Sequence, residues 1–368
     1  MKKILYIVST LKRSGPTNQL SYIIKYLDKA KYEPIVLTLS PEPKEDSMKN
    51  YFTATLGVRV DTLGLSRVKG LLFAKSHIKK FIDDNNIDLV HSQGIRADRL
   101  MSGIEIPRVA TLRNYPYYDY PMTYGNIKGF IMGKMHLSYL KKIDAPRVVS
   151  KSISDMLKKF NNYDIDFVRN GTDTQRFEDL DKKALREKLG IDQGIKLFVS
   201  VGHLSSRKDP LTVIKAFQDA QIENSRLIFL GDGNLHSECM SVIGEDKSIE
   251  LIGKVDNVHE YLGASDYCVS ASLAEGLPNT VLEAMACGLP CILSNIPPHV
   301  EIHEINKNSS LMFETKDVKG LSEKLKEVVN KDYQVMSKAS KEIVFDNLSA
   351  QIMSGNYQEI YKSLLSSC

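Results

Sequence analysis

The sequence predicts an α/β protein of two domains, each with a mainly parallel sheet covered by helices. The chain has 368 residues, which is too many for one ordinary hydrophobic core, so two domains of roughly 150 to 200 residues are expected. Along the chain, short apolar runs alternate with segments whose apolar residues recur every three or four positions. Such alternation places helices on both faces of a parallel sheet.

The first half contains six apolar runs that we predict to be strands: 4–9, 34–39, 87–91, 108–112, 147–150 and 165–168. After the first run, Leu20, Ile23, Ile24 and Leu27 keep a helical spacing. Gly15 lies at the turn before this helix, where backbone amides can approach a phosphate. One glycine is a weak signal, and an ordinary turn is the alternative.

His91 is expected to end the strand 87–91, at the edge of the sheet where open α/β folds bind ligands. A lone histidine is otherwise more often an ordinary polar residue at a strand end. Asn170-Gly171-Thr172-Asp173 is a turn signal and a suitable boundary between the two halves.

Residues 113–142 combine aromatic and basic side chains. The second part, 128–142, can form a helix with a broad apolar face and basic ends, which is the composition of a helix that lies on a membrane surface. A core helix packed on the sheet, with solvated lysines, is the alternative. Composition by itself leaves both interpretations open, with an anionic membrane surface as the candidate partner of residues 113–142.

The second half contains five further predicted strands: 195–202, 227–233, 249–255, 267–271 and 290–293. The Gly-x-Gly at 231–233 lacks the third glycine of a dinucleotide-binding fingerprint. The chain is predicted to be helical after Asp317, and 348–365 is a long amphipathic segment. These patterns disfavour a nicotinamide-dependent oxidoreductase.

Charge and composition narrow the classes of partner. Residues 1–170 carry 28 Lys and Arg against 16 Asp and Glu, a net charge of +12, whereas the remainder carries −8. The basic half is expected to meet something anionic. Nucleic acid is disfavoured because no recognition module accompanies the charge. No signal peptide and no run of eighteen apolar residues occurs, so we expect a cytoplasmic protein, or one attached to a membrane from its cytosolic side.

No metal site is expected from the cysteines or the acids. All five cysteines lie in the second half. Cys287 and Cys291 have the spacing Cys-x3-Cys, but no second pair of metal ligands accompanies them. They are interpreted as buried thiols in a reducing compartment. No Asp-x-Asp follows a predicted strand to hold Mg²⁺.

Arg207 and Lys208 follow the first strand of the second half, directly before the helix start at Asp209-Pro210. Cations placed beside helix N-terminal amides form a local anion site. A solvated charge pair in a loop is the alternative.

The stretch 272–294 contains two carboxylates, Glu275 and Glu283. Glu275 follows a strand, at the ligand-binding edge of an open sheet. Asn279 or Thr280 is expected to cap the helix that follows, with Glu283 in its first turn. The alternatives are a solvated loop acid for Glu275, and for Glu283 a capping box with Thr280.

The segment EGLPNTVLEAMACGLPCILS, followed by Asn-Ile-Pro-Pro, resembles the signature of the retaining glycosyltransferases of family 4. The resemblance implies the GT-B fold, two Rossmann-like domains facing each other across a cleft. It implies domains at 1–170, for the acceptor, and 171–345, for the nucleotide sugar, with a last helix at 346–368 that crosses back to the first domain.

The resemblance also implies site residues. Glu275 is expected against the donor sugar, Arg207 and Lys208 on its diphosphate, and His91 near the sugar and the acceptor. Many relatives have a second histidine where this chain has Gln93, so only His91 is carried over. Donor-binding residues implied by the resemblance are Gly15, Gly202, Lys254, Val255, Gly276, Leu277, Pro278, Asn279, Thr280 and Glu283.

The expected activity is transfer of a hexose or N-acetylhexosamine from a nucleoside diphosphate sugar, most commonly UDP-linked, to a saccharide or lipid-linked acceptor in surface polysaccharide assembly. Because Arg207 and Lys208 can stabilise the leaving diphosphate, we expect a reaction that needs neither a metal ion nor a cofactor. The alternatives are a nucleotide-sugar epimerase of the same fold and a binding protein without catalysis. A glycosidase pair of carboxylates is disfavoured because Glu283 belongs to the helix start.

Overall fold

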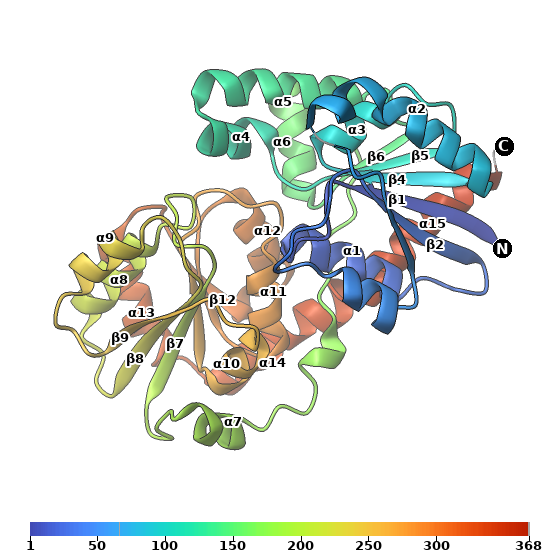
Figure 1. The fold of residues 1–368 in the computed structure, drawn as a ribbon. Coiled ribbons are helices and arrows are strands. Elements are labelled where there is room, and N and C mark those ends of the chain that lie inside the picture. The colour runs from blue at the N-terminus through green and yellow to red at the C-terminus, as the bar shows by residue number, and fades with distance from the viewer. Residues whose placement is uncertain (66, 367–368) are drawn as a thin grey trace. The chain divides into compact units, whose positions relative to one another are not determined.

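The structure is a computed structural model that describes residues 1–65 and 67–366, and it divides into two compact units (Figure 1). Unit 1 contains Met1–Gly171 and the C-terminal segment from Ala350, and unit 2 contains Thr172–Ser349. The boundary expected at 345 lies inside the short helix η4 (Ile343–Asn347), and the chain changes units four residues later.

Unit 1 has a six-stranded sheet in the order β3-β2-β1-β4-β5-β6, with parallel neighbours. Its strands are β1 (Lys2–Val8), β2 (Tyr32–Thr38), β3 (Arg59–Thr62), β4 (Leu89–Gln93), β5 (Arg108–Leu112) and β6 (Ala145–Val148). Its helices are α1 (Gly15–Lys25), η1 (Tyr51–Thr55), α2 (Arg67–Asn85), α3 (Ile95–Met101), α4 (Pro116–Tyr124), α5 (Asn126–Leu140), α6 (Lys151–Asn161) and α15 (Ala350–Ser366).

The sequence patterns missed one strand of this sheet and predicted another that does not form. The strand β3 was not predicted, because its Arg-Val-Asp-Thr sequence is mostly polar and it lies at the sheet edge. The run 165–168 instead makes an isolated bridge between Phe167 and Val148. The other predicted strands of the first half are confirmed, with bounds shifted by up to two residues.

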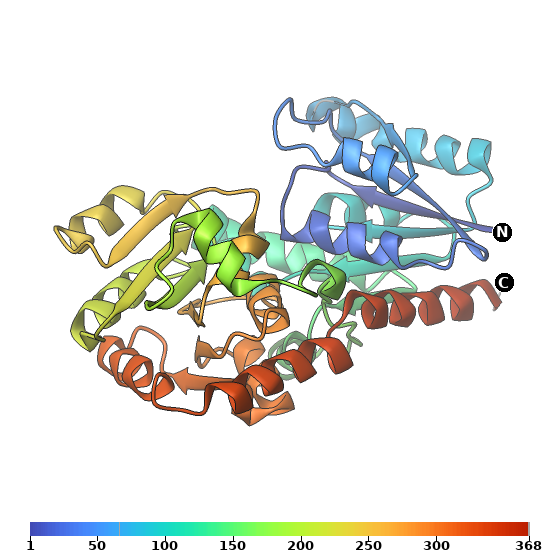
Figure 2. The same ribbon diagram turned by 90° about the horizontal axis from the view of Figure 1, so that it is seen from below.

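The last helix, α15, belongs to unit 1 and packs against α1 (Figure 2). Its Tyr357 and Tyr361 are buried in the same hydrophobic cluster as the side chains of α1 and β1. The Ser354 hydroxyl donates a hydrogen bond to the carbonyl oxygen of Ile23 over 2.8 Å. This helix therefore covers one face of the first sheet, although it comes from the other end of the chain.

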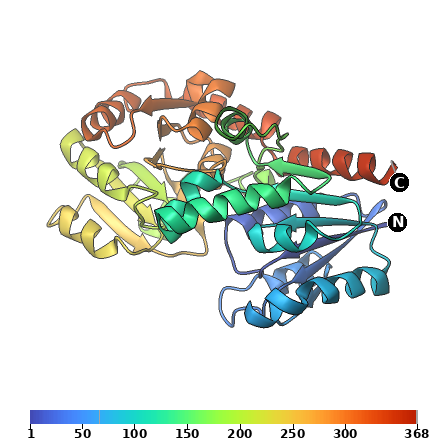
Figure 3. The same ribbon diagram turned by 90° about the horizontal axis from the view of Figure 1, so that it is seen from above.

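Helices α4 and α5 form an antiparallel hairpin on unit 1 (Figures 1 and 3). The backbone of α4 approaches Gly129 so closely that a Cβ there would lie 2.3 Å from the nitrogen of Pro121. His136 ties the hairpin to its surroundings: its Nε2 lies 2.7 Å from Asp98 of α3, and its Nδ1 lies 2.6 Å from the Tyr120 hydroxyl. All of these groups hold α5 in a defined position over α3.

Unit 2 also has a six-stranded parallel sheet, in the order β12-β11-β10-β7-β8-β9. Its strands are β7 (Lys196–Val201), β8 (Ser225–Leu230), β9 (Ile249–Gly253), β10 (Tyr267–Ser270), β11 (Cys291–Ser294) and β12 (Ser310–Phe313). Besides η4, its helices are η2 (Thr174–Arg176), α7 (Lys182–Leu189), α8 (Pro210–Ala220), α9 (His236–Ile243), α10 (Val258–Ala264), α11 (Asn279–Ala286), α12 (Pro297–Ile305), η3 (Lys307–Ser309), α13 (Val318–Val328) and α14 (Tyr333–Glu342).

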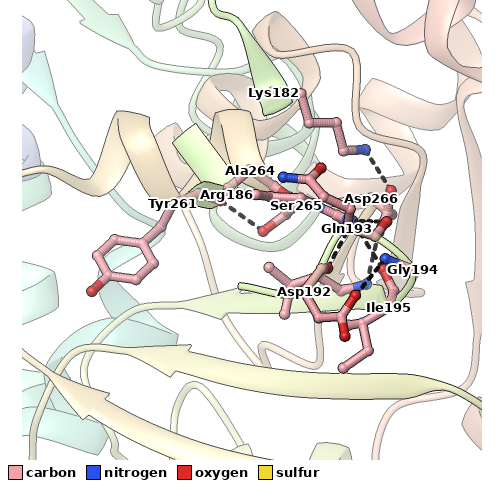
Figure 4. Close-up of polar contacts among 11 residues, drawn as sticks. Lys182, Arg186, Asp192, Gln193, Gly194, Ile195, Tyr261, Ala264, Ser265 and Asp266 are labelled. Atoms are coloured by element: carbon pink, nitrogen blue, oxygen red, sulfur yellow. Dashed lines mark hydrogen bonds and ion pairs between the residues drawn. The ribbon is translucent and has the colours of Figure 1, made fainter. Parts of the chain in front are cut away.

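At the amino edge of the second sheet, a buried arginine joins three segments (Figure 4). Arg186 of α7 donates to the carbonyl oxygens of Gln193 and Ala264 over 2.9 Å each, and its Nη2 lies 2.6 Å from the Asp266 carboxylate. Asp266 also accepts the backbone N–H of Leu197 over 2.7 Å. The guanidinium thus replaces the water that these carbonyl groups would otherwise need.

None of the described helices is both long enough and apolar enough to span a bilayer. Within residues 1–65 and 67–366, no three His, Cys, Asp or Glu side chains are grouped so that they could hold a metal ion. Cys239, Cys268 and Cys291 are buried, and Cys287 is half-buried. The last cysteine of the sequence lies outside the described residues.

Candidate active site

The second sheet places Glu275 in the loop between β10 and α11, beyond the carboxyl end of the strand. Gly276, Leu277 and Pro278 are buried beside it, so the turn is packed against the unit rather than solvated. The alternative of a solvated loop acid is therefore wrong, because the Glu275 side chain is only 9% exposed.

Two cations and a hydroxyl surround the Glu275 carboxylate. Lys208 Nζ lies 2.6 Å from Oε1, and Arg207 Nη1 lies 3.1 Å from Oε2. The Ser272 hydroxyl donates to Oε1 over 2.9 Å. Both carboxylate oxygens are therefore bound, and the three charged groups form one cluster.

The cluster keeps Glu275 ionised. Burial by itself would raise its pKa, but the charges of Lys208 and Arg207 outweigh that effect and lower the pKa to about 2. At neutral pH the carboxylate is negative, so it can accept hydrogen bonds from hydroxyl groups.

The backbone holds the cations in place. Arg207 Nη1 donates to the carbonyl oxygen of Ala274 over 2.8 Å, and the Arg207 carbonyl accepts from Leu273 N–H over 2.8 Å. Lys208 extends over Gly202, where a Cβ would lie 2.9 Å from its Cε. Gly202, predicted to bind the donor, thus makes room for the lysine chain at the end of β7.

His299 of α12 is a neighbour of Glu275 that the sequence analysis missed. Its Nδ1 lies 3.0 Å from the carbonyl oxygen of Ser294, and its side chain is fully buried. Burial lowers its pKa to about 4, while the charge of Glu275 opposes this effect. The ring is therefore neutral at pH 7. The Pro-Pro start of α12 after β11 was the signal that could have placed it at this edge.

Glu283 lies in the second turn of α11, not in the first as expected, because the helix starts at Asn279. Pro278 is the N-cap residue, and within the described residues no side chain caps this helix. The capping box with Thr280 is therefore not formed. Burial raises the pKa of Glu283 to about 7, and the charge of Arg176 limits this rise. Such a group can accept and donate hydrogen bonds near neutral pH.

The remaining predicted donor-binding residues of unit 2 lie around the same sheet edge. Asn279 and Thr280 are half-buried at the start of α11. Lys254 is exposed and Val255 half-buried, directly after β9 ends at Gly253. The loops after β7, β9 and β10 thus all contribute to the carboxyl edge of the second sheet.

The prediction that His91 ends its strand is wrong, because β4 continues to Gln93. The His91 ring is fully buried, with Nδ1 2.7 Å from the Tyr361 hydroxyl and Nε2 2.7 Å from the Thr111 hydroxyl. Burial lowers its pKa to about 3, and the charge of Arg113 adds to the effect. In this structure Nδ1 therefore contacts α15 through Tyr361, and Nε2 contacts β5 through Thr111.

Other groups occupy the carboxyl edge of the first sheet. The Gln93 Oε1 accepts from Arg113 Nη2 over 2.7 Å, and Arg113 Nη1 donates to Asn170 Oδ1 over 3.1 Å. Asn170 is buried, and the predicted boundary turn contains the change of unit between Gly171 and Thr172. Gly15 is the first residue of α1, whose N-cap residue is Ser14.

Comparison with known protein families shows to which family the chain belongs. The family model described as Glycosyl transferases group 1 matches residues 181–343, and that described as Glycosyltransferase Family 4 matches residues 13–176. This chain belongs to the family 4 glycosyltransferases. It is a glycosyltransferase that uses a nucleotide-sugar donor, and the predicted family and fold are confirmed.

Three similar proteins illustrate the relationship. The O-antigen biosynthesis glycosyltransferase WclY of Escherichia coli is 26% identical over 98% of both chains. A UDP-Gal:alpha-D-GlcNAc-diphosphoundecaprenol alpha-1,3-galactosyltransferase of Escherichia coli is 34% identical over 36% of this chain and 37% of its own. HepE of Anabaena, solved in complex with UDP, shares the fold with a TM-score of 0.79 and 16% identity, over 99% of this chain and 100% of its own.

Proposed function

We propose that this glycosyltransferase moves a hexose or N-acetylhexosamine from a UDP-linked donor to a hydroxyl of a saccharide or lipid-linked acceptor, with retention of configuration, in surface polysaccharide assembly. One observation carries the proposal. Glu275, Arg207 and Lys208 meet at the carboxyl edge of the second sheet, where an open α/β unit binds its ligand.

The cluster has the charges that the reaction requires. As the glycosidic bond breaks, negative charge develops on the leaving diphosphate, and preorganised cations stabilise it. Arg207 and Lys208 are already held by backbone contacts and by Glu275. They supply this charge without a metal ion in our proposal. The ionised Glu275 accepts hydrogen bonds from the sugar hydroxyls.

Glu283 is proposed to hold the ribose of the nucleotide. It lies on α11, eight residues after Glu275 in the sequence, and burial raises its pKa to about 7 although the charge of Arg176 opposes the rise. Two ribose hydroxyls would supply hydrogen-bonding partners for this carboxyl group. The choice of UDP follows the donor in the name of the Escherichia coli galactosyltransferase and the UDP complex of HepE.

The surface of α4 and α5 supports peripheral docking on an anionic membrane. Side chains that face the protein on α5 include His136, Leu137 and Leu140, whereas Ile127 is 81% and Phe130 58% exposed. A core helix would bury such residues. The same helix carries lysines at 128 and 134, and two more follow its end at 141 and 142, as on helices that bind the membrane interface.

Calorimetric titration tests the donor assignment. UDP is expected to bind at micromolar strength, more tightly than GDP or ADP, and Glu283→Ala is expected to weaken UDP binding by about tenfold or more. Glu323→Ala, which removes an exposed carboxylate on α13, is the matched control. If no nucleotide binds, or if both variants bind UDP as the unmodified protein does, the donor site is not where we propose it.

A further inference from the structure

A cavity of about 660 Å³ lies in unit 1, and the sequence analysis did not predict it. Ser9 and Thr10 line it directly after β1, and Ser40 lines it after β2. The cavity is therefore at the carboxyl edge of the first sheet. Its size lies in the range of small-molecule sites, and it is much larger than a single phosphate.

Two arginines of α3 line the same cavity, Arg96 and Arg99. Arg96 Nη1 donates to the Ser40 hydroxyl over 2.5 Å, which orients the guanidinium along the wall. Asp98, between them in sequence, does not neutralise them, because its carboxylate bonds to His136 and Ser92 in the interior. Within residues 1–65 and 67–366, Arg99 has no carboxylate partner.

The cavity is therefore positive, and its chemistry suits an anion. Two guanidinium groups three residues apart on one helix repel each other unless a negative group lies between them. Guanidinium and hydroxyl donors together match the oxygens of phosphate, which arginine binds in a bidentate manner. A phosphate or diphosphate group would meet donors from α3 and from the ends of β1 and β2.

Another part of the cavity wall comes from α5, and it is apolar and continues onto the surface. Tyr139 and Met135 of α5 line it, and Met135 is also 43% exposed. Going back along α5 in steps of four residues, Ile131 is 53% and Ile127 81% exposed. Residues four apart form a ridge on a helix, so these side chains make an apolar track of about 12 Å from Met135 to Ile127.

From these two features we propose that unit 1 binds a phosphate-bearing lipid, with the phosphate between Arg96 and Arg99 and the hydrocarbon chain along the ridge from Met135 to Ile127. The inference rests on the proposed function, because this lipid would be the acceptor or would carry it. The Asp98–His136 bond fixes α3 against α5, and so sets the distance between the anion site and the apolar ridge.

Binding of three soluble probes tests the proposal on the full chain by calorimetry, below the micelle concentration. Methyl phosphate presents the head group, decyl maltoside the chain, and decyl phosphate both. Decyl phosphate is expected to bind at least tenfold more tightly than either of the others. Arg99→Gln is expected to weaken it by about 10- to 100-fold, as for loss of a charged hydrogen bond.

Two variants separate the parts of the site. Arg59→Gln removes an exposed arginine at the amino end of β3 and should bind decyl phosphate normally. Ile131→Ser removes an exposed apolar side chain, and should weaken decyl phosphate while leaving methyl phosphate unchanged. Thermal unfolding confirms that each variant is folded.

The proposal is overturned if Arg99→Gln and Arg59→Gln bind decyl phosphate equally well, or if methyl phosphate binds as tightly as decyl phosphate, which would indicate a site for free phosphate. UDP titration of the same samples decides the proposed function separately. Loss of UDP binding with intact decyl phosphate binding would refute the donor site alone, and the reverse result would refute this inference alone.

Discussion

Replacing Glu275 by glutamine should destabilise unit 2, and the structure gives the size of the effect. The pKa of Glu275 falls from 4.5 to about 2 in the folded protein. At about 1.4 kcal/mol per unit, the ionised carboxylate contributes roughly 3 kcal/mol. Its side chain is only 9% exposed, so solvent screens little of this. Glu275→Gln removes the charge but keeps the shape, and should lower the free energy of unfolding by about that amount at pH 7.

The pH dependence checks the cause. Because the folded pKa lies below the unfolded value, the contribution is complete above pH 4.5 and decreases as the pH falls toward about 2. Urea unfolding followed by circular dichroism should therefore show the two proteins converging as the pH is lowered from 5 to 3. Glu323→Gln, on the exposed side of α13, should match the unmodified protein throughout. A difference below about 1 kcal/mol at pH 7, or one that does not change with pH, would refute the charge argument.

Three further predictions concern the same unit. Lys208→Met should lower kcat by about 100- to 1,000-fold in a steady-state transfer assay, because the diphosphate loses a preorganised cation, whereas Lys215→Met on exposed α8 surface should not. Burial lowers the pKa of His299 from 6.5 in the unfolded chain to about 4, so its contribution to stability is complete above pH 6.5 and decreases toward pH 4. His299→Gln should therefore reduce the pH dependence of the free energy of unfolding, measured in urea, between pH 6.5 and 4. Arg186→Ala should lower the free energy of unfolding by about 3–5 kcal/mol, since it leaves several buried carbonyl oxygens without their donor and removes one of the two cations paired with Asp266, while calorimetry shows an unchanged UDP affinity.

Much of the fold and of the donor site could be predicted because the signals are local. Buried parallel strands are continuous apolar runs, so β1, β2, β5, β7, β8 and β10 stand out in the sequence. Glu275, Arg207 and Lys208 each follow such a strand, and the parallel sheet brings the ends of β7 and β10 to one edge. The edge strand β3 carries no such run, and so only pairing with β2 revealed it.

Positions that depend on long-range packing could not be predicted. His91 looked like a strand-end residue, but Tyr361, 270 positions later, and Thr111 bind its two nitrogens. The start of α11 was expected after a polar cap at Asn279 or Thr280 and instead follows Pro278, which places Glu283 in the second turn rather than the first. His299 had no signature of its own, because its place beside Glu275 comes from the neighbouring strands β10 and β11.

The sequence by itself determined the two α/β units, the family and the cation pair beside an acid, since each of these is written in residues close together along the chain. Only the tertiary structure decided which charges are buried and which are open. It joined Glu275 to Lys208 across 67 positions of chain and turned Asp98 inward to His136, leaving Arg99 in the cavity without an acid in the described part of the chain. Burial and pairing of charge depend on which segments pack together, and that is a property of the folded units rather than of any short stretch.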